Sequence, residues 1–188
     1  MKNVVVVYES KYGYTEKYAK WISEELDTDL FSTSDINLEK LNNYNCIIYG
    51  GGLYAGGISG INLITKNYDK LKDKTVVVFT CGLADPKEEI NIENIKVSLS
   101  KVFDEKAMKD IKFFHLRGGI NYKKLNFMHK AMMAMIKKVL SKKDPKELKS
   151  EEVTLLDTYG KEIDFSDKNT IAPIVEFVKE VENYSSNK

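Results

Sequence analysis

Residues 3–15 read NVVVVYESKYGYT, and this stretch decides the fold class. Its first part, residues 3–8, is a β-branched run too short for a helix, so we predict a buried strand there. A turn that contains glycine follows, and Thr15 then begins a helix that we expect to extend to about Leu26, with apolar residues at helical spacing. A buried strand that leads through a short turn into a helix is typical of an α/β protein with a parallel sheet.

The same alternation continues along the chain. We predict further strands at 28–33, 46–49, 75–80 and 111–116, a short helix or turn at 38–44, and helices at 58–71, 87–103, 125–140 and 170–181. Right-handed crossovers favour the strand order 2-1-3-4-5 for five parallel strands. We therefore predict a three-layer α/β/α sandwich in a single domain, residues 1–188, with a helical insertion at 118–150 after the fifth strand.

Composition excludes several classes of protein. The chain has 188 residues, of which 43% are hydrophobic and 30% are charged, so it can bury a core. It contains no apolar run long enough for a membrane-spanning helix and no secretory leader, and we expect a cytoplasmic protein. Two cysteines and two well-separated histidines are too few for a disulfide scaffold or a metal site, so we expect no bound metal.

The net charge of +1 hides an asymmetry. Residues 123–149 contain nine lysines against two acidic residues, a local charge of +7, so the rest of the chain carries −6. An acidic body with one basic segment indicates a localised anionic partner rather than nucleic acid, although a solvated lysine-rich helix would show the same composition. The single arginine, Arg117, comes just before this segment.

The turn after the first strand predicts a phosphate site. Two hydroxyl side chains bracket a glycine and precede a helix, whose N-terminal N–H groups and dipole favour an anion. The turn matches neither a nucleotide P-loop nor a dinucleotide GxGxxG motif, and an ordinary helix cap at Thr15 is the alternative. The candidate residues are Ser10, Lys11, Tyr12, Gly13, Tyr14 and Thr15.

Two more loops are expected at the same edge of the sheet. Residues 50–57 read GGGLYAGG, in which five glycines allow a flat ligand to approach the backbone and Tyr54 offers a ring for stacking. Residues 80–85 read TCGLAD and follow the next strand. One loop suited to phosphate and two suited to a planar group together predict a mononucleotide flavin.

These three loops resemble the FMN-contacting loops of flavodoxin-like proteins, and the resemblance covers essentially the whole chain. It implies a flavodoxin-like fold, FMN as cofactor, and the phosphate bound by residues 10–15. It also implies that a backbone carbonyl at Gly56 or Gly57 can turn toward flavin N5. The residues that it places beside the isoalloxazine are Gly52, Leu53, Tyr54, Ala55 and Gly56 on one side and Thr80, Cys81, Gly82 and Leu83 on the other.

The segment from Leu116 to Lys138 is similar to the insertion of bacterial quinone-dependent protoporphyrinogen IX dehydrogenases. This resemblance implies an FMN-dependent oxidoreductase that oxidises protoporphyrinogen IX with a quinone acceptor. The alternative is a flavodoxin-type carrier that functions in electron transport and docks on redox protein partners. No catalytic side chain is predicted.

The expected insertion helix has an apolar stripe made of Leu125, Met128, Met132, Ile136 and Val139. With its lysines, segment 123–143 is suited to peripheral contact with the inner membrane face or to a substrate that bears carboxylates. The stripe could equally pack on the body or in a homo-oligomer. The candidate contacts for substrate or partner are Arg117, Lys130 and Lys137, with Arg117 either binding a carboxylate or bracing the loop.

Overall fold

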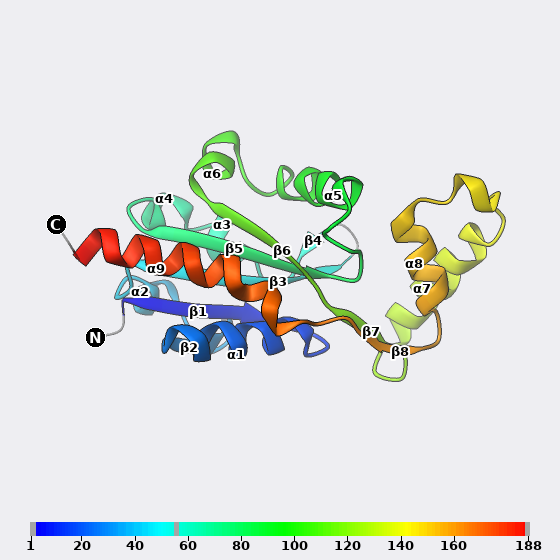
Figure 1. The fold of residues 1–188 in the computed structure, drawn as a ribbon, viewed down its shortest axis with the longest axis horizontal. Helices are drawn as coiled ribbons and strands as arrows, with labels where there is room; N and C mark the ends of the chain where they lie inside the picture. The colour runs from blue at the N-terminus through cyan, green and yellow to red at the C-terminus, as the bar shows by residue number, and fades with distance from the viewer. Residues whose placement is uncertain (1–2, 55–56, 187–188) are drawn as a thin grey trace.

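A computed structural model describes residues 3–54 and 57–186 of the chain (Figure 1). Five parallel strands form the central sheet, in the order β2-β1-β3-β5-β6, which confirms the predicted fold and strand order. A sixth strand, β4, pairs antiparallel with the end of β3. The bounds are β1 Val4–Glu9, β2 Asp29–Ser32, β3 Cys46–Tyr54, β4 Gly57–Ile58, β5 Thr75–Gly82 and β6 Lys112–Arg117.

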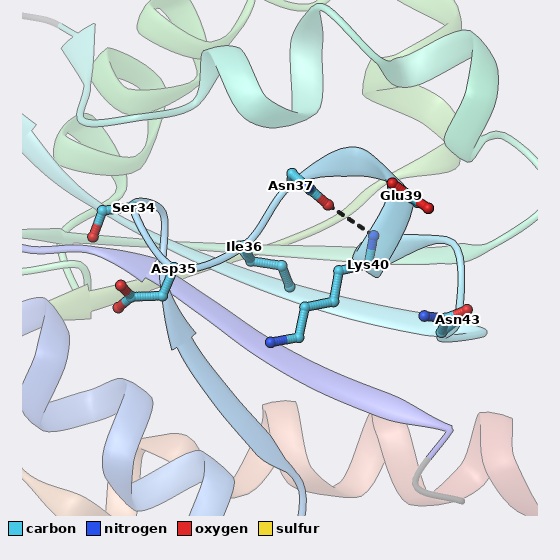
Figure 2. A pocket seen from close by; sticks show the side chains of 7 residues that line it. All are labelled: Ser34, Asp35, Ile36, Asn37, Glu39, Lys40 and Asn43. Atoms are coloured by element: carbon cyan, nitrogen blue, oxygen red, sulfur yellow. Dashed lines mark hydrogen bonds between the residues drawn. The ribbon is translucent and has the colours of Figure 1, made fainter.

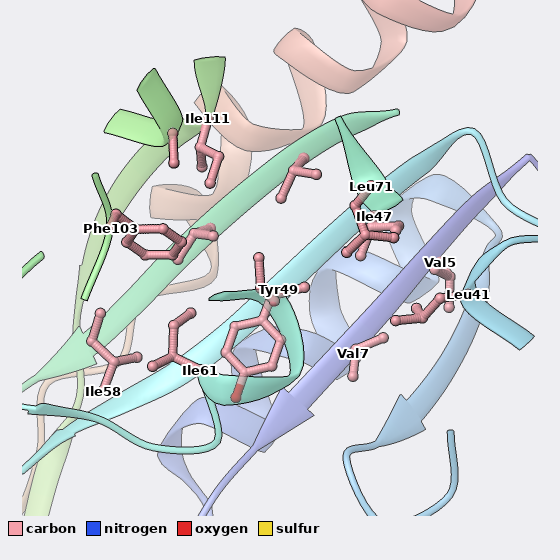
Figure 3. Packing of buried hydrophobic residues seen from close by; sticks show 14 of the residues in the cluster. Val5, Val7, Leu41, Ile47, Tyr49, Ile58, Ile61, Leu71, Phe103 and Ile111 are labelled. Atoms are coloured by element: carbon pink, nitrogen blue, oxygen red, sulfur yellow. The ribbon is translucent and has the colours of Figure 1, made fainter. Parts of the chain in front are cut away.

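Helices cover both faces of the sheet because successive side chains of a strand point to opposite faces. In β1, Val5 and Val7 pack in the core shown in Figure 3, beneath α2 (Leu38–Leu41), α3 (Asn62–Thr65), α4 (Tyr68–Leu71), α5 (Glu89–Leu99) and α6 (Glu105–Asp110). Val4 and Val6 pack on the other face, against α1 (Tyr14–Leu26) and α9 (Ala172–Ser186). Both layers of the predicted sandwich are therefore filled.

Two predicted helices are wrong in extent. The helix predicted at 58–71 is instead β4 followed by the two single-turn helices α3 and α4. Ile58 pairs with Leu53 of β3, and the Asn67 side chain donates to the carbonyl of Leu63 at 2.9 Å, so a side chain competes with the helical backbone pattern. The helix predicted at 87–103 ends at Leu99.

After β6 the chain leaves the sandwich and returns to it. It forms β7 (Gly119–Asn121), α7 (Phe127–Leu140), the short 3₁₀ helix η1 (Pro145–Glu147), α8 (Ser150–Thr158) and β8 (Glu162–Asp164). Strands β7 and β8 pair antiparallel and close the excursion at a neck, so the predicted boundary at residue 150 is too early. In Figure 1 α7 and α8 form a lobe beyond the carboxyl ends of the strands.

The 3₁₀ helix η2 (Lys168–Ile171) then leads into α9. Within the described residues, every helix is too short or too polar to cross a bilayer.

Candidate functional site

A cavity of about 330 Å³ lies between the carboxyl ends of the strands and the lobe. Its volume is within the range of small-molecule sites in proteins. The strand ends and their loops contribute Tyr12, Tyr14, Thr15, Leu53, Tyr54, Cys81, Gly82 and Leu83. The neck and lobe contribute Gly118, Gly119, Ile120, Asn121, Leu125, His129, Met132, Met133, Ile136 and Leu155.

The turn after β1 presents a helix N-terminus to the edge of this cavity. Gly13 is the N-cap residue of α1 and has φ at 94°, a left-handed conformation that favours glycine. The N–H of Gly13 donates to Ser10 Oγ at 3.1 Å, which fixes the turn, and Thr15 is buried in the first turn of the helix. The first N–H groups of a helix have no partner within the helix, so this end of α1 is suited to an anion.

The glycine-rich segment is part of the sheet rather than a separate loop. Gly50, Gly51 and Gly52 all continue β3, so that strand is longer than predicted. Leu53 and Tyr54 then line the cavity, and burial raises the pKa of the Tyr54 hydroxyl well above its usual value. Tyr54 therefore presents an uncharged ring to the cavity.

The segment after β5 supplies the facing wall. Gly82 and Leu83 line the cavity together with Cys81, and burial raises the pKa of the Cys81 thiol to about 12. A thiol with this pKa is protonated at neutral pH, so it does not act as a nucleophile. Thr80 lies outside the cavity, because it is fully buried and its Oγ is 2.8 Å from His115 Nδ1.

The neck approaches these walls closely because it contains two glycines. The N–H of Gly118 donates to the carbonyl of Gly82 at 2.7 Å, which joins the neck to the end of β5. A Cβ atom on Gly119 would lie 2.7 Å from Cε1 of Tyr14, so a larger residue would push the neck away. On the other side of the neck, Lys17 of α1 forms an ion pair with Asp164 at 2.7 Å.

His129, in the first turn of α7, contacts both the turn after β1 and the end of β3. Its Nδ1 atom lies 2.6 Å from the hydroxyl of Tyr12, and its Nε2 atom lies 3.4 Å from Nζ of Lys11. Its ring also stacks on Tyr54, with the centroids 5.9 Å apart. The side chain of His129 therefore connects the lobe to the turn after β1 and to the end of β3.

The charged candidates lie outside the cavity. Arg117 pairs with Asp85 at 2.8 Å and its guanidinium lies over the ring of Phe165, so it braces the loop after β5. Nζ of Lys130 donates to the carbonyl of Lys123 at 3.4 Å. Nζ of Lys137 lies over the ring of Tyr159. Among the described residues that line the cavity, none is lysine or arginine.

The apolar stripe predicted for α7 is wrong in part. Leu125, Met132 and Ile136 do face the cavity, but Met128 and Val139 are exposed and do not line it. The inner side is completed by His129, and by Met133 and Leu140, which are buried. The prediction failed because α7 is apolar on both sides, so hydrophobic spacing does not identify the side that packs.

The remaining predicted residues flank the cavity or lie outside the residues that the structure describes. Ser10, Lys11, Gly13 and Gly52 belong to the segments that form it but do not line it. Ala55 and Gly56 lie outside the described residues. The contributions of the neck, of His129 and of Leu155 were missed, and the glycine pair at 118–119 was the one local signal for a close approach there.

A second hollow, of about 470 Å³, lies between the loop after β2 and α2 (Figure 2). Of the residues that line it, only Ile36 is buried, and the others are exposed polar or charged side chains. Asn37 uses its side chain to cap α2, where its oxygen accepts from the N–H of Lys40. This hollow is a feature of the surface, whereas the cavity under α7 is enclosed by elements distant in sequence.

Comparison with known proteins matches most of the chain to a protein family. A family model described as a flavodoxin domain matches residues 5–148. An uncharacterized protein of Methanocaldococcus jannaschii is 27% identical over 128 residues, which make up 64% of this chain and 85% of that protein.

Similar solved structures include the WrbA-like flavodoxin of Agrobacterium tumefaciens, with 22% identity, a TM-score of 0.40, and coverage of 54% of this chain and 73% of that one. For oxidised flavodoxin 2 of Bacillus cereus these values are 20%, 0.42, 61% and 84%. For a flavoprotein in complex with FMN from Lactobacillus acidophilus they are 19%, 0.40, 62% and 93%.

Proposed function

The chain belongs to the flavodoxin domain family, and from this premise we propose that it binds FMN and acts in redox chemistry. The observation that carries the proposal is the convergence of three segments on one cavity. They are the helix N-terminus after β1, the end of β3 and the end of β5, all at the carboxyl edge of the sheet. This edge is where open α/β sheets bind their ligands.

The residues present fit this cofactor. The turn from Ser10 to Thr15 offers hydroxyl groups and helical N–H groups to a phosphate, at the edge of the cavity. Tyr54 and Leu53 on one side, and Gly82 and Leu83 on the other, offer an uncharged and largely apolar slot to a flat ring system. When bound, FMN supplies one- and two-electron transfer.

The chain itself would bind and orient the reacting molecule and exclude water from it. The inner side of α7 covers the cavity with Met132, Met133 and Ile136, so a reacting molecule would meet an apolar wall. The ring of His129 also lines this wall, and its Nδ1 atom lies 2.6 Å from the hydroxyl of Tyr12. This arrangement supports the enzyme hypothesis over the carrier hypothesis, because a carrier that docks on redox proteins needs an uncovered cofactor edge.

For the substrate, the lining favours a flat, apolar acceptor of the quinone class, which is reduced to a quinol by two electrons and two protons. Oxidation of protoporphyrinogen IX is our proposal for the donor half of the reaction; the porphyrinogen loses six electrons and six protons, so three quinones are reduced for each porphyrin formed. The cavity itself offers this donor no lysine or arginine for its carboxylates among the described lining residues. The lysine or arginine side chains that bind these carboxylates would have to lie outside the cavity.

The test is an anaerobic mixing experiment on FMN-loaded protein, followed by flavin absorbance. We expect protoporphyrinogen IX to bleach the flavin and a soluble menaquinone analogue to restore its colour. Replacing Ile136, which lines the cavity, by tryptophan should slow the quinone step by about tenfold or more, because well-packed sites tolerate little added volume.

Met135→Trp is the matched control, since Met135 lies one residue earlier on the exposed side of α7. Its quinone step should match that of the wild type. If neither compound changes the flavin absorbance but a flavodoxin reductase reduces the flavin, the carrier hypothesis would replace the enzyme hypothesis. Equal rates of the quinone step in the two tryptophan variants would show that the reacting molecule does not bind in the cavity under α7.

A further inference from the structure

The outer side of α7 is apolar although none of the residues that the structure describes covers it. Phe127 is 88% exposed, Met128 73%, Met135 63% and Val139 56%. The same helix also carries Met133 and Leu140, which are buried. Burial therefore explains these apolar side chains, while the four exposed side chains, which we call the outer face, are not packed by the residues that the structure describes.

Lysines surround this outer face. Residues 123–149 carry a local charge of +7, whereas the rest of the chain carries −6. Lys124, Lys138 and Lys142 are exposed and lie three or four residues along the chain from Met128, Met135 and Val139, respectively. Apolar side chains ringed by cations require a partner whose surface is anionic and also accepts hydrocarbon.

We propose that the outer face of α7 docks on the surface of an anionic lipid membrane. Phe127, Met128, Met135 and Val139 would enter the boundary between headgroups and acyl chains, while the lysines pair with anionic headgroups. A second copy of the chain is a poorer partner, because two segments of charge +7 repel each other. With 14 residues α7 is too short to span a bilayer, so it would lie in the plane of the surface.

The position of α7 on the membrane would affect how a reacting molecule reaches the cavity. This part of the inference rests on the proposed function, whereas the docking itself does not. The inner side of α7 covers the cavity and its outer face would contact lipid, so the two are separated by one helix, about 10 Å in diameter. An apolar acceptor dissolved in the membrane could then approach the cavity around a single helix.

Vesicle co-sedimentation tests the docking, with phosphatidylcholine vesicles prepared with or without phosphatidylglycerol. We expect the full chain to bind only the vesicles that contain phosphatidylglycerol, and less as the salt concentration rises. The double variant Phe127→Ser/Met135→Ser should bind about tenfold more weakly or worse, because it removes most of the exposed apolar surface. Its folding should be unchanged, since both side chains lie outside the packed core.

Two matched controls separate this surface from general stickiness. Val97 on α5 is 57% exposed, and Val97→Ser should not alter binding. Lys138→Gln/Lys142→Gln should weaken binding by roughly fivefold for each lysine. Lys106→Gln/Lys109→Gln, which removes two exposed lysines of α6, should have a much smaller effect.

Three results would overturn the proposal. One is no binding to anionic vesicles at low salt. Another is binding that the double variant at Phe127 and Met135 leaves unchanged. The third is a dimer in sedimentation velocity that this double variant dissociates, without lipid binding by the wild type, because it would assign the outer face to a second copy of the chain. Since none of these readouts uses flavin, they are independent of the proposed function.

Discussion

His115 shows how a single buried side chain couples this fold to pH. It lies in β6, where its Nδ1 atom is 2.8 Å from Oγ of Thr80 in the neighbouring strand β5. Burial, together with the nearby charge of Lys96, lowers the pKa of His115 from 6.5 to about 4. The hydroxyl of Thr80, a residue that the family resemblance places beside the flavin, is thus used within the sheet.

We predict that this imidazole makes the protein less stable in acid. Below pH 6.5 the unfolded chain binds a proton at His115 that the folded chain does not bind until about pH 4. The free energy of unfolding should therefore fall as pH decreases through this window, by up to about 3 kcal/mol from this group.

Urea unfolding of the wild type and His115→Gln at a series of pH values measures this contribution. The difference in unfolding free energy between the two proteins should change across the window from pH 6.5 to about 4 and stay constant above it. A difference that is the same at every pH would show that His115 is protonated equally in both states.

At the scale of the element, α7 depends on the residue that caps its N-terminus. Asn126 is this N-cap residue, and its side-chain oxygen accepts from the N–H of His129 at 2.8 Å. The same residue, His129, contacts Tyr12 and Tyr54 through its ring. The Asn126 cap therefore positions both the helix and its contact with the ligand loops.

We predict that Asn126→Ala loosens the lobe without disturbing the sandwich. Loss of an N-cap costs about 1 kcal/mol, so amide exchange in the first turn of α7 should become several-fold faster. Asn37→Ala is the matched control, because Asn37 caps α2 through the N–H of Lys40. It should affect exchange only near α2, and faster exchange in α7 in that variant would show that the effect is not local.

Sequence patterns predicted this element only in part. The existence of α7 follows from its composition, but its inward side does not, because Met128 and Met133 are equivalent to any measure of hydrophobicity. The strands β7 and β8 have three residues each, too few for an alternating pattern to be recognised. They follow Gly118, whose N–H donates to the carbonyl of Gly82 at the end of β5, a contact between segments distant in sequence.

At the scale of the whole molecule, the sheet was predictable and the enclosure of the site was not. Strands such as residues 4–7 and 76–79 are continuously apolar because both faces of the sheet are covered, which makes them visible in the sequence. Their order then places the three ligand segments at one edge. The cover contributed by His129, which is 117 residues from its partner Tyr12, depends on tertiary packing that no local pattern records.

The central claim is that this edge of the sheet binds FMN, and a titration of the flavin-free protein with FMN tests it most directly. We predict saturable binding of one FMN per chain, with the flavin fluorescence quenched by the ring of Tyr54, and weaker quenching in Tyr54→Leu. A titration without saturation, or flavin fluorescence that never changes on mixing, would contradict the account.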